Sequence, residues 1–206
     1  VTIMKNVILG LAVSAALAVS AAASAEPSYY EGFDYADKQK LNAAATADVA
    51  EKHDVFGAFY GVKLDKLTLE GRMEDEIVHD PAGHQGLMQG KAALDVVTVA
   101  GVTPYVAGAV GYKSKQTINF DYYVAEGGLK YNVAGLVDLK LASRIRSPFS
   151  EKHDHEVGSD LYRTVENSVA ASVKLPAKNS VVVKYARERG DSNYNTWSVG
   201  LTHSFK

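Results

Sequence analysis

A two-residue alternation of apolar and charged side chains recurs from residue 55 to the last residue, and it constrains the fold more than any other feature. It is clearest over residues 137–146, where Leu139, Leu141 and Ile145 alternate with Lys140 and Arg144. Successive side chains of a β-strand point to opposite faces, so this spacing predicts strands with one apolar and one charged face. A soluble β-sandwich shows the same alternation with its apolar face inward, and the pattern alone therefore does not identify the solvent.

Residues 1–25 indicate the solvent, because they have the features of a secretory leader. Lys5 provides the positive charge, residues 7–22 form an apolar run, and Ala23 and Ala25 mark a small-residue cleavage site. The alternative interpretation is a retained membrane anchor. An exported chain whose strands have one apolar and one charged face is typical of a barrel in a Gram-negative outer membrane.

Composition excludes several classes of function. The formal net charge is −2, which argues against a strongly basic nucleic-acid-binding protein. The chain contains no cysteine, so it forms neither disulfides nor thiolate metal sites. After the leader, no segment reaches the roughly 20 apolar residues that a spanning helix needs, so any membrane span is made of strands.

The alternation predicts nine strands between Phe56 and Phe205, joined by short turns and longer polar connections in strict alternation. The longer connections are expected at residues 75–85, 114–119, 147–160 and 188–193. Bacterial single-chain barrels have an even number of strands, so a tenth strand is required. Residues 41–52 can provide it, with apolar and polar residues on opposite faces. Their alanine-rich composition also favours a helix, in which case a barrel of eight strands is the alternative.

The expected organisation has three segments. Residues 1–25 form the signal peptide, residues 26–40 an N-terminal periplasmic segment, and residues 41–206 the outer-membrane β-barrel domain. The second segment contains four aromatic residues, which belong either to a periplasmic segment or to an extra edge strand: Tyr29, Tyr30, Phe33 and Tyr35.

The sequence PYVAGAVGY at residues 104–112, the leader, the rhythm of strands and connections, and the aromatic Phe205 near the C-terminus resemble small outer-membrane β-barrel proteins of the porin-like type. Lys206 departs from the usual terminal phenylalanine. The resemblance covers nearly the whole mature chain, at the level of the class and not of one family. It implies an all-β, closed antiparallel up-and-down transmembrane barrel in the cell outer membrane, surrounded by its lipid, with passive transport or a structural role.

In such a barrel the charged faces line a lumen, with an excess of basic residues. The residues expected there are Glu70, Arg72, Lys91, Glu126, Lys130, Asp138, Lys140, Arg144, Glu166 and Lys184. A barrel of about eight to ten strands is barely wider than its side chains, so these ions are expected to pair across the lumen. Inward Gly61 and Gly111 leave some room. Two interpretations stay open: a sealed structural core, and a narrow water-filled path that favours anions.

Histidines in the predicted external loops suggest two further functions. His79, His84, His153 and His155 are candidate ligands for zinc, copper or nickel, and the alternative is solvated loops without metal. His153 and Asp154 also resemble a general base with its orienting partner. No nucleophile signature accompanies them, so we do not expect an enzyme.

We therefore predict a small porin-like passive channel for ions or small solutes, with no cofactor and no nucleic-acid partner. One alternative is a non-conducting structural barrel, or an adhesin or receptor that binds through the loop at residues 147–160. The less favoured alternatives are a hydrolase at the barrel rim and a metal-binding protein that uses the loop histidines.

Overall fold

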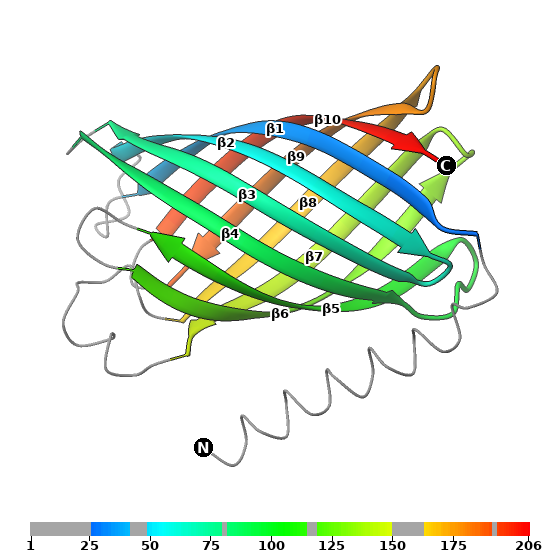
Figure 1. The fold of residues 1–206 in the computed structure, drawn as a ribbon, viewed down its shortest axis with the longest axis horizontal. Helices are drawn as coiled ribbons and strands as arrows, with labels where there is room; N and C mark the ends of the chain where they lie inside the picture. The colour runs from blue at the N-terminus through cyan, green and yellow to red at the C-terminus, as the bar shows by residue number, and fades with distance from the viewer. Residues whose placement is uncertain (1–25, 42–48, 80–81, 115–118, 150–162, 191–192) are drawn as a thin grey trace, which may run out of the picture.

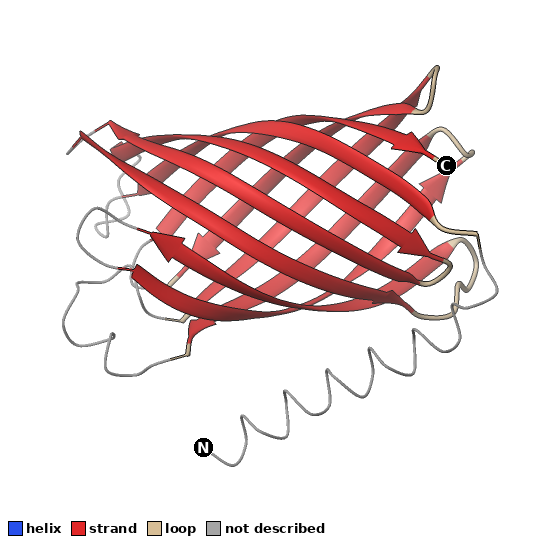
Figure 2. Ribbon diagram, in the orientation of Figure 1, coloured by secondary structure: helices blue, strands red, loops and turns tan. Residues whose placement is uncertain are grey.

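The computed structural model describes residues 26–41, 49–79, 82–114, 119–149, 163–190 and 193–206. Within these residues ten strands form one closed antiparallel barrel (Figure 1; Figure 2). Consecutive strands pair with each other, and β1 closes the ring by pairing with β10. The predicted signal peptide lies outside the described residues. Among those that are described, no helix is long and apolar enough to span a membrane.

The strands have between 11 and 16 residues, enough to cross a hydrocarbon core at a tilt of roughly 45°. Their bounds are β1 Ser28–Leu41, β2 Val49–Leu64, β3 Leu67–His79, β4 Ala82–Asp95, β5 Val102–Ser114, β6 Asn119–Val133, β7 Val137–Pro148, β8 Thr164–Leu175, β9 Asn179–Arg189 and β10 Asn193–Phe205. The predicted fold class is confirmed, with ten strands and not eight.

Tight hairpin connections join the strands at one end of the barrel. Their residues with positive φ are Asp65, Ala100, Gly101, Ala134, Gly135, Ala177 and Lys178. Left-handed residues suit tight β-hairpins, because their twist matches that of the flanking strands. The two ends of the barrel domain lie here too, since Tyr29 of β1 is opposite Phe205 of β10. We assign this end to the periplasm, as in bacterial barrels with short periplasmic turns.

The opposite, external end has the longest connection, residues 149–163 between β7 and β8. The expected strict alternation of short and long connections is not observed. Only residues 80–81 separate β3 from β4, and residues 190–192 separate β9 from β10. The reason is that the strands continue further: β3 runs to His79, although a loop was expected from Asp75.

The tenth strand is β1, Ser28–Leu41, and not residues 41–52 as the alanine-rich alternation suggested. This places in the barrel wall a segment that we expected in the periplasm; residues 42–48 lie outside the described residues. The physical reason is that aromatic residues alternate here with small and charged ones, and aromatic side chains favour a pleated, half-buried surface. By pairing with both β2 and β10, this strand leaves no open sheet edge.

Large apolar side chains face outward around the barrel and are exposed, among them Met73, Met88, Val110, Leu141 and Trp197. The buried polar side chains face the interior instead: His53, Glu76, Lys113, Thr164, Glu166 and Glu188. This is the reverse of a soluble protein, and only a hydrocarbon solvent makes such an exterior favourable. The predicted orientation, with apolar faces toward lipid and charged faces toward the barrel axis, is therefore confirmed.

Candidate functional site

The inward faces of the strands enclose a polar cavity of about 360 Å³. Its charged lining consists of Asp34, Glu70, Glu74, Glu76, Glu126, Glu166 and Glu188 with Lys38, Arg72, Lys91, Lys113, Lys140, Arg144, Arg146 and Lys184. A second cavity of about 110 Å³ is lined by Thr68, Ala93 and Lys130, nearer the periplasmic end. Glu70, Lys91 and Lys140 border both cavities, which therefore follow one another along the barrel.

The ions pair along the barrel wall and not across the lumen as expected. All eight basic side chains of the larger cavity contact a carboxylate. Several pairs connect strands that are separated by one strand, as Lys38 of β1 does with Glu76 of β3. Because partners lie close together on the same side of the wall, their pairing leaves the central space unfilled.

Near the external end, Glu76 accepts hydrogen bonds from two lysines and contacts a histidine. Its carboxylate lies 3.1 Å from Lys38 Nζ, 3.1 Å from Lys113 Nζ and 2.5 Å from His53 Nδ1. The other ring nitrogen of His53 lies 3.0 Å from Glu51 Oε1. A buried carboxylate without such partners would be strongly unfavourable, so the cluster stabilises this level of the barrel as a unit.

At the middle of the barrel, Arg72 of β3 links two carboxylates. Its Nη2 donates to both oxygens of Asp34, at 2.8 and 2.6 Å, and its Nε donates to Glu74 at 2.5 Å. A guanidinium group has several N–H donors in one plane, so it can contact two carboxylates at the same time. Gly57 faces this pair, and a Cβ there would collide with the Asp34 and Arg72 side chains.

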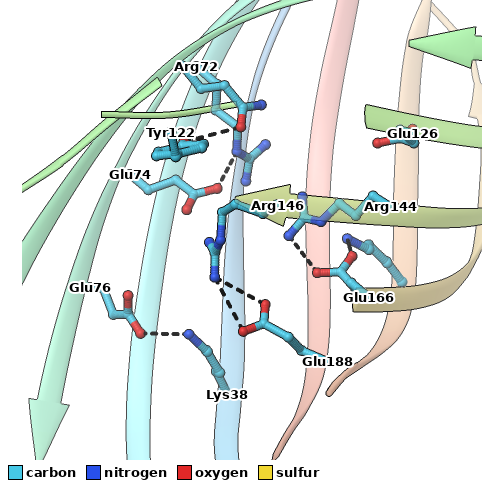
Figure 3. A network of polar contacts seen from close by, with 12 residues as sticks. Lys38, Arg72, Glu74, Glu76, Tyr122, Glu126, Arg144, Arg146, Glu166 and Glu188 are labelled. Carbon is cyan, nitrogen blue, oxygen red and sulfur yellow. Dashed lines mark hydrogen bonds and ion pairs between the residues drawn. The ribbon is translucent and has the colours of Figure 1, made fainter. Parts of the chain in front are cut away.

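The opposite wall carries a second chain of ion pairs, on β7, β8 and β9. Arg144 donates to Glu166 at 2.5 Å, and Lys184 donates to the other oxygen of Glu166 at 2.8 Å. Arg146 donates to Glu188 at 3.3 Å. Figure 3 shows Arg144 beside Glu166 and Arg146 beside Glu188.

The two cavities meet at a cluster around Glu126 of β6. Its carboxylate lies 3.0 Å from Lys91 Nζ and 3.1 Å from Lys140 Nζ, and it accepts a hydrogen bond of 2.7 Å from the Tyr105 hydroxyl. Tyr105 is only 2% exposed, and Lys140 Nζ lies 4.8 Å from its ring centroid. These four side chains form the junction between the cavities, which we call the Glu126 cluster.

Inward glycines do not leave open space, which corrects the expectation from the sequence. A Cβ on Gly61 would collide with the ring of Tyr30, and a Cβ on Gly111 with the ring of Tyr122. In both cases the tyrosine is the cross-strand partner of the glycine. The missing side chain lets the ring lie on the wall, so these glycines accommodate aromatic residues.

Eight of the ten predicted lumen residues line the larger cavity: Glu70, Arg72, Lys91, Glu126, Lys140, Arg144, Glu166 and Lys184. Lys130 lines the smaller cavity and pairs with Asp95. Asp138 pairs with Lys174 at 3.3 Å, where both side chains are about half exposed.

Sequence reasoning missed four carboxylate or lysine residues of the lining: Asp34, Lys38, Glu76 and Glu188. The first two lie on β1, which was not expected to be a strand. The other two lie where β3 and β9 continue beyond their predicted ends. In all of these segments the two-residue alternation was present in the sequence and is the signal that would have found them.

The structure brings the predicted histidine ligands to carboxylates and not to one another. His79 Nε2 lies 2.6 Å from Asp54, and His84 Nδ1 lies 3.8 Å from Asp75. Over the described ranges, no group of three or more histidine, aspartate and glutamate side chains is arranged to hold a metal ion. His153 and His155 lie outside these ranges. So does Asp154, the predicted orienting partner of His153 as a general base.

A closed barrel with an apolar exterior, an ionic interior and its termini at the end with tight turns is an outer-membrane β-barrel. No family model matches the sequence, and no curated protein matches it either.

The fold is similar to solved outer-membrane barrels. The COG4313 outer membrane channel from Pseudomonas putida F1 is 10% identical, with a TM-score of 0.53, over 87% of this chain and 95% of the channel. Neisserial surface protein A is 15% identical, with a TM-score of 0.44, over 86% of this chain and 97% of that protein. The KdgM porin in complex with disordered oligogalacturonate is 11% identical, with a TM-score of 0.45, over 85% of this chain and 99% of the porin.

Proposed function

We propose that this protein is a narrow passive channel for small ions and small solutes across the outer membrane. The observation that carries the proposal is the pairing of the charged side chains along the wall, which leaves a polar cavity of about 360 Å³ in the lumen. Side chains that met across the axis would instead fill the interior. The second cavity extends the polar space toward the periplasmic end, past the Glu126 cluster.

The proposed channel discriminates weakly between anions and cations. Seven carboxylates and eight basic groups line the larger cavity, so their charges nearly cancel. A pore selects ions by the charge of the rings that line it, and a small basic excess gives a mild preference for anions. The lining residues to which we assign conduction are Arg72, Arg144, Glu166 and Lys184 at mid-height, with Lys91, Glu126 and Lys140 at the junction.

Of the solved barrels with a similar fold, one is named as a channel and another as a surface protein. Fold similarity therefore does not choose between a conducting barrel and a structural or adhesive one. The choice depends on the lumen.

Conductance of the reconstituted protein in a planar bilayer tests the proposal. The intact barrel should give small, stable current steps. Tyr105→Ala removes the ring at the Glu126 cluster and should raise the single-channel conductance, whereas Tyr105→Phe keeps the ring and should change it little. Tyr131→Ala is the matched control, because Tyr131 is an exposed tyrosine on the outward face of β6.

Insertion and folding of each variant are checked by its heat-dependent mobility on a gel. Silent membranes with correctly folded wild-type and Tyr105→Ala protein would contradict the channel and leave the structural or adhesive role. An equal rise in conductance for Tyr131→Ala would show that the junction does not limit the current.

A further inference from the structure

Three exposed arginines lie at the external ends of β8 and β9, two of them on the outward face of β9. Arg187 and Arg189 are exposed, and they alternate with buried, inward Ala186 and Glu188. Arg163 is exposed and directly precedes β8. Its backbone lies beside Gly190, since a Cβ on that glycine would be 3.0 Å from the Arg163 carbonyl oxygen. We call Arg163, Arg187 and Arg189 the arginine patch.

The patch differs from the basic groups of the lumen in having no acidic partner within the described parts of the chain. Glu166 and Glu188 are the acidic residues of β8, β9 and β10, and both face inward, where they pair with Arg144 and Arg146. Outward, Arg187 is opposite two asparagines, Asn167 of β8 and Asn195 of β10. On the described parts of β8, β9 and β10, three guanidinium groups and two amides therefore lie together without an outward carboxylate.

The depth of this surface in the membrane follows from the aromatic pair beside it. Tyr185 and Trp197 are cross-strand partners on the outward face, with ring centroids 4.7 Å apart. Paired aromatic residues at the end of an apolar band mark the level of the lipid headgroups. Arg187 follows Tyr185 by two residues toward the external end, on the same face. The arginine patch therefore lies at headgroup level and faces lipid.

We propose that the arginine patch binds the phosphate group of an anionic lipid in the outer leaflet. Guanidinium groups bind phosphate oxygens through paired, charge-assisted hydrogen bonds, and the neighbouring asparagine amides add neutral donors. Basic side chains at headgroup level attract anionic lipids. The neighbouring sector of the rim, on the other side of β10, has the reverse charge, with outward Asp37, Asp54 and Asp75 on β1, β2 and β3, so lipid phosphate would bind the β8–β9 side of the barrel. This proposal is independent of conduction through the lumen.

Trp197 provides a local measurement, because it is the single tryptophan of the chain and lies next to the patch. The folded full-length protein is titrated in detergent micelles with brominated phosphatidate or brominated phosphatidylcholine, and quenching of Trp197 fluorescence is recorded. We expect half-maximal quenching at a phosphatidate mole fraction about tenfold lower than for phosphatidylcholine. Arg187→Gln with Arg189→Gln should reduce this preference to within about twofold.

A double variant at the periplasmic end is the matched control. Lys66→Gln with Lys178→Gln also removes two positive charges, here from exposed turn residues, and this variant should keep the preference for phosphatidate. The proposal is overturned if the arginine variant keeps the full preference, or if the control loses it equally. Competition by excess inorganic phosphate that abolishes the preference would show a site for free anions and would also overturn the lipid assignment.

Discussion

At the level of single residues, the inner wall is built from aromatic rings that lie over glycines. Each pair joins direct cross-strand partners: Tyr30 with Gly61, Phe59 with Gly32, Tyr105 with Gly128, and Tyr122 with Gly111. A ring covers the backbone of the glycine, which restores packing that a strand loses when it has no side chain. Packing on the glycine holds each ring against the wall, and Tyr105 in addition reaches the Glu126 cluster and lines the second cavity.

Alanine at one of these glycines should therefore be destabilising. Gly61→Ala places a methyl group against the Tyr30 ring, and overpacking of this kind costs roughly 1–3 kcal/mol of unfolding free energy. Gly71→Ala is the control, because nothing lies within 4 Å of a Cβ on this outward glycine. Urea unfolding in lipid vesicles, followed by Trp197 fluorescence, measures both. Equal stability of the two variants would mean that the ring moves away freely.

At the level of the strands, side chains add connections that the hydrogen-bond ladder lacks. Lys38 and Glu76 connect β1 to β3, Lys91 and Glu126 connect β4 to β6, and Arg146 and Glu188 connect β7 to β9. Each pair crosses an intervening strand. These contacts stabilise the curvature of the closed sheet, because both partners lose their compensation if the strands separate.

The seam between β1 and its neighbours has an additional contact on the lipid side. The Tyr29 ring of β1 stacks on Phe205 of β10, with centroids 5.9 Å apart, and on Tyr60 of β2, at 6.4 Å. A single residue thus connects the first, second and last strands at the periplasmic end. Aromatic pairs of this kind contribute about 0.5–1.5 kcal/mol each beyond the area they bury.

We expect Tyr29→Ala to weaken this seam, lowering the unfolding free energy by about 1–3 kcal/mol through the loss of two ring contacts. Tyr112→Ala is the control: Tyr112 is an exposed outward tyrosine of β5, and the ring contacts found among the described residues do not include it. The two variants are compared by the urea concentration at which each barrel unfolds in vesicles. Equal losses of unfolding free energy in the two variants would show that the seam does not depend on Tyr29.

For the barrel as one body, the important quantity is the charge that remains in the lumen after pairing. Carboxylates and basic groups nearly balance in the larger cavity, so a channel of this kind has weak selectivity. The balance is sensitive to single substitutions, because Glu166 is shared by Arg144 and Lys184. Removing one of these charges therefore changes the net charge of the lumen lining and leaves the strands of the barrel wall in place.

Two substitutions at this place should shift ion preference in opposite directions. Glu166→Gln leaves Arg144 and Lys184 without their carboxylate and should move the reversal potential in a potassium chloride gradient toward that of chloride. Lys184→Gln should move it toward that of potassium. Asp138→Asn at the half-exposed pair with Lys174 serves as the comparison and should shift the potential less. Shifts of the same sign for both lumen variants would contradict conduction along this wall.

Much of the fold was predictable because the two-residue alternation is a local property. It indicated nine strands, the outward apolar faces and the inward position of residues such as Arg72, Lys140 and Glu166. It was less informative about where strands end: β3 and β9 continue beyond their predicted limits, which hid Glu76 and Glu188. It also placed the tenth strand at residues 41–52 and not at β1, although both segments alternate.

The sequence by itself indicated which side of each strand meets lipid, because the alternation separates apolar from charged side chains and the leader-like residues 1–25 favour an outer-membrane barrel over a soluble sandwich. Only the tertiary structure decided which ions pair and whether they fill the lumen. Partners such as Arg72 and Asp34 are 38 residues apart, and their contact depends on the register and closure of the sheet. Closure joins β1 to β10, so the lining and the seam arise from strands that no local pattern connects.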